Sequence, residues 1–81
     1  MRPIIFDRHA RRRMRDRGLS PEEVFLAIRE PDKTEPTLKG RRNAFKQLEP
    51  QKAIRVTYLE QGGSILVITV VRRKRFPGGE Q

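Results

Sequence analysis

Apolar positions gather in short groups along the chain, and segments rich in charged or turn-forming residues separate them. Residues 53–59 and 65–71 are apolar, β-branched runs typical of strands, and a glycine-containing turn joins them. The runs 34–38 and 43–48 predict two further strands, while residues 3–6 fit either an extended lead-in or an edge strand. The second half of the chain therefore predicts a four-stranded antiparallel meander.

Signals for two helices lie between the first apolar group and these strands. Asp7 is a good N-cap for a first helix, which Gly18 would end in the left-handed conformation. Ser20 and Glu23 form a capping-box pair at the start of a second helix, and Pro31 ends it. We therefore expect an α+β fold in which two N-terminal helices pack on one face of a four-stranded antiparallel sheet. Phe25 and Phe45 are expected in its core.

The length of the chain, 81 residues, suits one domain but not two separate cores. We expect this domain to span residues 1–76, followed by a disordered tail at residues 77–81. A chain this short buries a limited share of its surface, so a homodimer or a stabilising partner is compatible with it. No cysteine, signal peptide or membrane-spanning apolar run is evident, which predicts a cytoplasmic protein with no membrane partner.

Charge narrows the choice of partner. The chain holds 19 Lys and Arg residues against 10 Asp and Glu residues, a formal net charge of +9, and most of the cations are arginine. The planar guanidinium group suits bidentate contacts with phosphate better than the ammonium group of lysine. RNA or DNA is therefore the expected partner, followed by an acidic protein, and a merely soluble basic surface is the alternative.

Many of these arginines lie in the first predicted helix, in the stretch "DRHARRRMRDRG", together with His9, the only histidine. On a helix, His9, Arg13 and Arg17 would form one ridge beside a narrow buried stripe of Ala10 and Met14. The other arginines of the helix would face solvent or a polyanion. Alternatively, His9 is a residue at the helix end without a functional role, and Arg13 and Arg17 pack on the sheet and pair with carboxylates.

The loop length of the last hairpin decides which side chains share a face of the sheet. A three-residue loop, Gln61 to Gly63, would put Arg55 opposite Thr69, whereas a two-residue loop would put Thr69 beside Ile54. We prefer the first register because it separates apolar from polar side chains more cleanly. Its helix-covered face would hold Ile54, Val56, Tyr58, Leu66, Ile68 and Val70, and its open face Arg55, Thr57 and Thr69.

These residue types fit the chemistry of metal-independent RNA cleavage, which needs a base, an acid and cations on the phosphorane. Histidine exchanges a proton near neutral pH, so His9 is the candidate acid or base. The candidate catalytic residues are His9, Arg13, Arg55, Tyr58 and Thr69. The residues expected to bind phosphates are Arg12, Arg17, Arg41, Arg42, Arg72, Arg73 and Lys74. Because the carboxylates are scattered and cysteine is absent, we expect no metal or other cofactor.

The run His9-Ala10-x-x-Arg13-Met14-x-x-Arg17-Gly18-Leu19-Ser20-x-x-Glu23-Val24 resembles a family of small bacterial domains of unknown function. The later Val67-Ile68-Thr69 fits the same family. Those domains are similar in layout to RelE-like toxins, within the barnase–EndoU–colicin–RelE fold group. The resemblance implies a metal-independent ribonuclease paired with an acidic antitoxin protein, although a fold alone does not carry a function.

Three functions are compatible with the sequence. The first is the ribonuclease toxin of a toxin–antitoxin pair, which would cleave RNA either free or on the ribosome. The second is a non-catalytic nucleic-acid-binding module, since two helices joined at Gly18 look like a helix-turn-helix. Against it, the second helix has "VFLAI" at its centre, where a recognition helix should be polar. The third is an interaction domain for an acidic protein.

Overall fold

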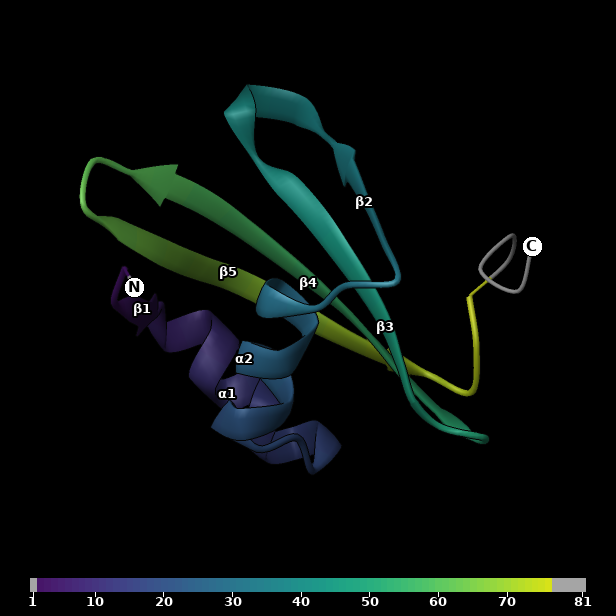
Figure 1. Cartoon of the computed structure of the whole chain (residues 1–81). Helices are drawn as coiled ribbons and strands as arrows, with labels where there is room; N and C mark the ends of the chain where they lie inside the picture. The colour runs from purple at the N-terminus through teal and green to yellow at the C-terminus, as the bar shows by residue number, and fades with distance from the viewer. Residues whose placement is uncertain (1, 77–81) are drawn as a thin grey trace.

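Two α-helices cover one face of a five-stranded mixed sheet in the computed structural model, which describes residues 2–76 (Figure 1). The elements are β1 Ile4–Phe6, α1 Arg8–Arg17, α2 Pro21–Arg29, β2 Lys33–Pro36, the short 3-10 helix η1 Leu38–Gly40, β3 Arg42–Glu49, β4 Lys52–Gln61 and β5 Ser64–Arg73. The α+β fold is thus confirmed. The tail expected at residues 77–81 lies outside the described residues. Within residues 2–76, no helix is long and apolar enough to cross a membrane.

The strands lie in the order β1-β5-β4-β3-β2. Strands β2 to β5 form the predicted antiparallel meander. Strand β1, however, pairs with β5 in parallel, with Ile4 opposite Ile65, so the prediction of a four-stranded, wholly antiparallel sheet is wrong. The edge strand that the sequence offered as one of two interpretations of residues 3–6 is therefore present. Its parallel pairing was not predicted, because it depends on β5, which lies far away in the sequence. Ile4 and Phe6 pack against the core and anchor the added strand.

The predicted helix ends are confirmed. The Asp7 side chain accepts a hydrogen bond from the backbone N–H of His9 at 2.6 Å, and Gly18 ends α1 with a φ of 66°. Both hydrogen bonds of the capping box between Ser20 and Glu23 are present. Each signal is local and satisfies backbone groups that a helix end leaves unpaired, which explains why the sequence predicted them well.

The core lies between the helices and the sheet. Its buried residues include Ala10 and Met14 of α1, Val24 and Ala27 of α2, Ala44 of β3, Ile54, Val56 and Tyr58 of β4, and Ile65, Val67 and Val70 of β5. The β4 part of the predicted face is therefore confirmed. On β5, Leu66 and Ile68 are only half-buried, and the buried side chains are those of Ile65 and Val67.

A bulge in β5 explains this difference. Gln61 lies opposite Ser64 across a two-residue turn, and further along the hairpin Thr57 lies opposite Thr69. Ile68 has no partner on β4, so the register shifts there by one residue and Arg55 lies opposite Val71. The preferred register is therefore wrong. The alternative register correctly predicts the two-residue loop, but it places Thr69 beside Ile54, whereas Thr69 lies opposite Thr57. Both assumed one uniform register, whereas an extra residue changes which face the following side chains occupy.

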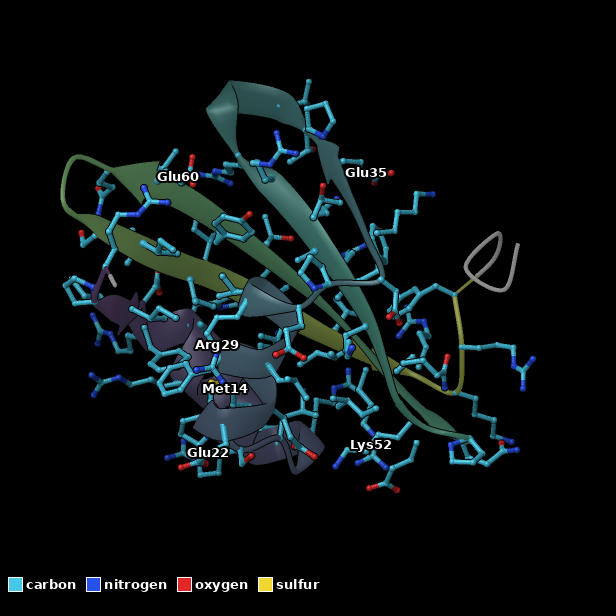
Figure 2. The ribbon with its side chains drawn as sticks, in the orientation of Figure 1. Met14, Glu22, Arg29, Glu35, Lys52 and Glu60 are labelled. Atoms are coloured by element: carbon cyan, nitrogen blue, oxygen red, sulfur yellow. The ribbon has the colours of Figure 1, made fainter. Side chains whose placement is uncertain are left out.

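A polar contact links α2 to β4. The Lys52 Nζ lies 2.6 Å from the Glu23 Oε2, and Figure 2 shows Lys52 reaching towards the helix pair. Burial alone would raise the pKa of Glu23, but the hydrogen bonds from Lys52 and Ser20 outweigh it and lower that pKa below its usual range. Glu23 therefore stays ionised and serves both the capping box and the contact between helix and sheet.

Candidate nucleic-acid interface

Helix α1 presents a dense row of cations to solvent. It packs on β5 through the buried side chains of Ala10 and Met14, as its spacing predicted. Arg13 is half-buried beside this stripe, whereas His9 and the remaining arginines of α1 are exposed. The ridge formed by His9, Arg13 and Arg17 therefore borders the contact with the sheet, and the other arginines project away from it.

None of the arginines of α1 pairs with a carboxylate within the described part of the chain. The ion pairs among residues 2–76 join Arg2 to Glu60, Lys46 to Asp32 and Lys52 to Glu23. Glu23, a carboxylate of the neighbouring helix α2, is engaged by Lys52. The guanidinium groups of α1 remain available to an external anion, and their mutual repulsion would fall when a polyanion binds.

Arg72 connects this helix to the basic run that ends β5. Its Nη1 donates a hydrogen bond to the backbone carbonyl of Arg17, with a donor–acceptor distance of 2.9 Å. A cation at the C-terminal end of a helix is also favoured by the helix dipole. The sequence predicted Arg72 as a phosphate ligand, and the structure gives it this additional structural contact. The basic residues 72–75 therefore begin beside the C-terminal end of α1.

The first turn of α1 lies at the edge of β5. The backbone N–H of Asp7 donates to the Val67 carbonyl at 3.0 Å, directly after the last residue pair between β1 and β5. His9 is exposed in this turn, and Thr69 lies two residues beyond Val67 on the same strand. The fold thus brings the turn that carries His9 and the β5 segment that carries Thr69 to one edge of the sheet.

The other candidate catalytic residues are distributed over both faces of the sheet. Val56 and Val70 face the helices, so Arg55 and Thr69, their neighbours along the strands, face the open side. Tyr58 is 7% exposed in the core, as the preferred register expected, and it also lines a hollow of about 220 Å³ beside Arg29. Arg55 is half-buried, and its Nε is buried without a hydrogen-bond partner among the described residues.

Among the predicted phosphate ligands, Arg12 lies on α1 and Arg73 and Lys74 follow Arg72 at the end of β5. Arg41 and Arg42 lie elsewhere, Arg41 directly before β3 and Arg42 at its first position, and β4 separates this strand from β5. Arg42 donates a hydrogen bond to the Thr34 hydroxyl at 3.2 Å. The predicted ligands therefore fall into two groups, one around α1 and the end of β5 and one at the β2–β3 hairpin.

Two aromatic residues on the open face were missed. Phe45 was expected in the core, but it is half-buried on the open face, where the Phe76 ring meets it edge-on at a centroid distance of 5.3 Å. This expectation was wrong because β3 has no clear alternation: the helix-facing positions beside Phe45 are Ala44 and Lys46, one apolar and one charged. No sequence signal marked the contact with Phe76.

In comparisons with known protein families, curated proteins and solved structures, none matches this chain.

Proposed function

We propose that the protein binds RNA through α1 and the end of β5 and cleaves it without a metal ion. The observation that carries the proposal is the row of exposed α1 arginines without carboxylate partners among residues 2–76, on the same helix as His9. Such a row suits a polyphosphate backbone better than any neutral ligand. The run from His9 to Val24 resembles a family of small domains that are similar in layout to RelE-like toxins, and this resemblance adds the ribonuclease activity to the proposal.

In the proposed mechanism, Arg13 and Arg17 bind the scissile phosphate and stabilise the charge that develops on it. The RNA 2′-oxygen attacks phosphorus and the bond to the 5′-oxygen breaks, which leaves a 2′,3′-cyclic phosphate and a 5′-hydroxyl. His9 either takes the proton from the 2′-hydroxyl or gives a proton to the departing 5′-oxygen. Arg55 and Thr69 would contact an RNA strand that passes around the β5 edge to the open face.

The biological setting follows from this activity. A cytoplasmic ribonuclease of this kind would act as the toxin of a toxin–antitoxin pair, and an acidic antitoxin protein would neutralise it by covering the same cations. RNA cleavage should be tested with total RNA in EDTA, with and without ribosomes, and with the product ends mapped. Cleavage that yields 2′,3′-cyclic phosphates and is lost in His9→Ala supports the mechanism, and unchanged cleavage by His9→Ala contradicts it.

Non-catalytic RNA binding is the second candidate, and the structural use of Arg72 favours it. Arg72 donates to the end of α1 in addition to its expected role as a phosphate ligand, and the cations of a surface that only binds RNA need exposure but no catalytic arrangement. Strong, salt-dependent RNA binding without turnover in the same assay would support this second function over the first.

A further inference from the structure

The open face of the sheet holds a pocket of about 410 Å³, on the opposite side of the sheet from the helices. Its apolar walls are Phe45, Pro50, Ala53 and Phe76, and cations including Lys33 and Arg75 also line it. Small-molecule sites in proteins span about 300–1,000 Å³, so a single nucleotide would fit. Figure 1 shows the segment after β5 turning back beside β3 and β2, which is how Phe76 comes to line this pocket.

The Phe45 ring, with a lysine ammonium over it, forms part of the pocket lining. Lys33, Phe45 and Arg55 are aligned across β2, β3 and β4 by direct residue pairs. The Lys33 Nζ lies 5.6 Å from the centroid of the Phe45 ring. On the other side, Arg55 has a buried Nε without a hydrogen-bond acceptor among residues 2–76. Lys33 therefore places a positive charge over the Phe45 ring inside the pocket, whereas Arg55 lies next to Phe45 on β4 without lining the pocket.

The acidic and amide side chains of the pocket are already engaged. Asp32 accepts a hydrogen bond from the backbone N–H of Gln47 and lies 3.5 Å from the Lys46 Nζ. The Glu35 carboxylate accepts a hydrogen bond from Asn43, and the Gln47 side-chain amide donates to the Lys74 carbonyl. Lys33 and Arg75, by contrast, have no ion-pair partner within the described chain. The charged groups of the lining that lack an ion-pair or hydrogen-bond partner among residues 2–76 are therefore cationic, which favours an anion that carries an aromatic ring.

We propose that this pocket binds one unstacked base of single-stranded RNA against Phe45 and Phe76, with the adjoining phosphate on Lys33 and Arg75. The inference rests on the proposed function in taking RNA as the ligand, and it adds a preference for single strands. Bases in a duplex are stacked and cannot enter a pocket, whereas splayed bases stack readily on aromatic side chains.

The test compares a short single-stranded oligoadenylate with a duplex RNA of equal length, by fluorescence anisotropy. The variants are Phe45→Leu and Phe76→Leu, and the matched control is Phe25→Leu, whose ring stacks on Phe6 on the helix side. Loss of base stacking should weaken single-strand binding about 5- to 100-fold while leaving duplex binding unchanged. AMP should compete for the single strand. Phe76 lies beyond the last strand, so its variant is expected to fold normally.

Single-strand affinities that are equal in Phe76→Leu, Phe25→Leu and wild type, with no competition by AMP, would overturn the proposal that this pocket binds a base. If Phe45→Leu and Phe76→Leu weaken single-strand and duplex binding equally, base binding in this pocket is also overturned. If wild type binds neither RNA even at low salt, the proposed function fails and this inference fails with it. The outcomes therefore separate failure of the pocket from failure of RNA binding.

Discussion

The guanidinium group of Arg72, at the end of β5, donates a hydrogen bond to the backbone carbonyl of Arg17, at the end of α1, across 2.9 Å. Carbonyl groups in the last turn of a helix have no partner within the helix. Helix α1 is also only ten residues long and crowded with like charges, so it depends on its packing against the sheet. The contact therefore stabilises the element that carries most of the proposed RNA-binding surface.

Replacing Arg72 should destabilise the protein. Arg72→Gln removes the positive charge at the C-terminal end of α1 and shortens the side chain that donates this hydrogen bond. We expect a loss of about 0.5–1.5 kcal/mol in the free energy of unfolding. Urea denaturation measures the loss. Lys74→Gln is the matched control, because its exposed side chain forms no hydrogen bond or ion pair within the described residues. Equal effects of the two variants would contradict the structural role of Arg72.

The contact between Glu23 and Lys52 should make the free energy of unfolding depend on pH in the acidic range. Because the pKa of Glu23 is lower in the folded state than its usual 4.5, the folded protein favours the ionised form. The resulting stabilisation is fully present above 4.5 and is lost as the pH falls through the lower, folded-state pKa. We expect Glu23→Gln to cost about 1 kcal/mol near neutral pH and progressively less in acid. Urea denaturation at several pH values measures this loss, and a loss in free energy of unfolding that stays constant as the pH falls would contradict the role of ionised Glu23.

The β5 bulge predicts an unusual pattern of core sensitivity. Val67 and Val70 are 0% and 1% exposed, although residues three apart in a regular strand face opposite sides. Val67→Ala and Val70→Ala should each cost about 2 kcal/mol in the free energy of unfolding. Ile68→Ala should cost less than either, since Ile68 is only half-buried. Chemical denaturation of the three variants checks the order, and a larger loss for Ile68→Ala would contradict the bulge.

Local chemistry explains which parts of the fold the sequence predicted. Asp7, Gly18 and the pair Ser20–Glu23 act on backbone groups within a few residues, so the ends of both helices were predictable. The parallel pairing of β1 and the unpaired Ile68 depend on contacts between segments far apart in the sequence. No periodic pattern records such contacts, and the prediction failed at those two places.

The same distinction applies to the candidate site. The ridge of His9, Arg13 and Arg17 follows from the helical period, and the observed α1 preserves that spacing. The contacts of Arg72 with Arg17 and of Phe45 with Phe76 join distant parts of the chain, and only the folded structure brings them together. The proposed RNA surface was therefore partly predictable, while the open-face pocket was not.

The central claim, that the α1 arginines bind RNA phosphates, is tested most directly by the salt dependence of RNA binding. The variant combines Arg11→Gln with Arg15→Gln, and the matched control combines Arg29→Gln with Lys39→Gln, which removes the same charge from exposed positions outside α1. For single-stranded RNA, losing two phosphate contacts should reduce the slope of log affinity against log salt concentration by about 1.4. We predict this reduction in the α1 variant and little change in the control. Equal slopes in the two variants would contradict the account.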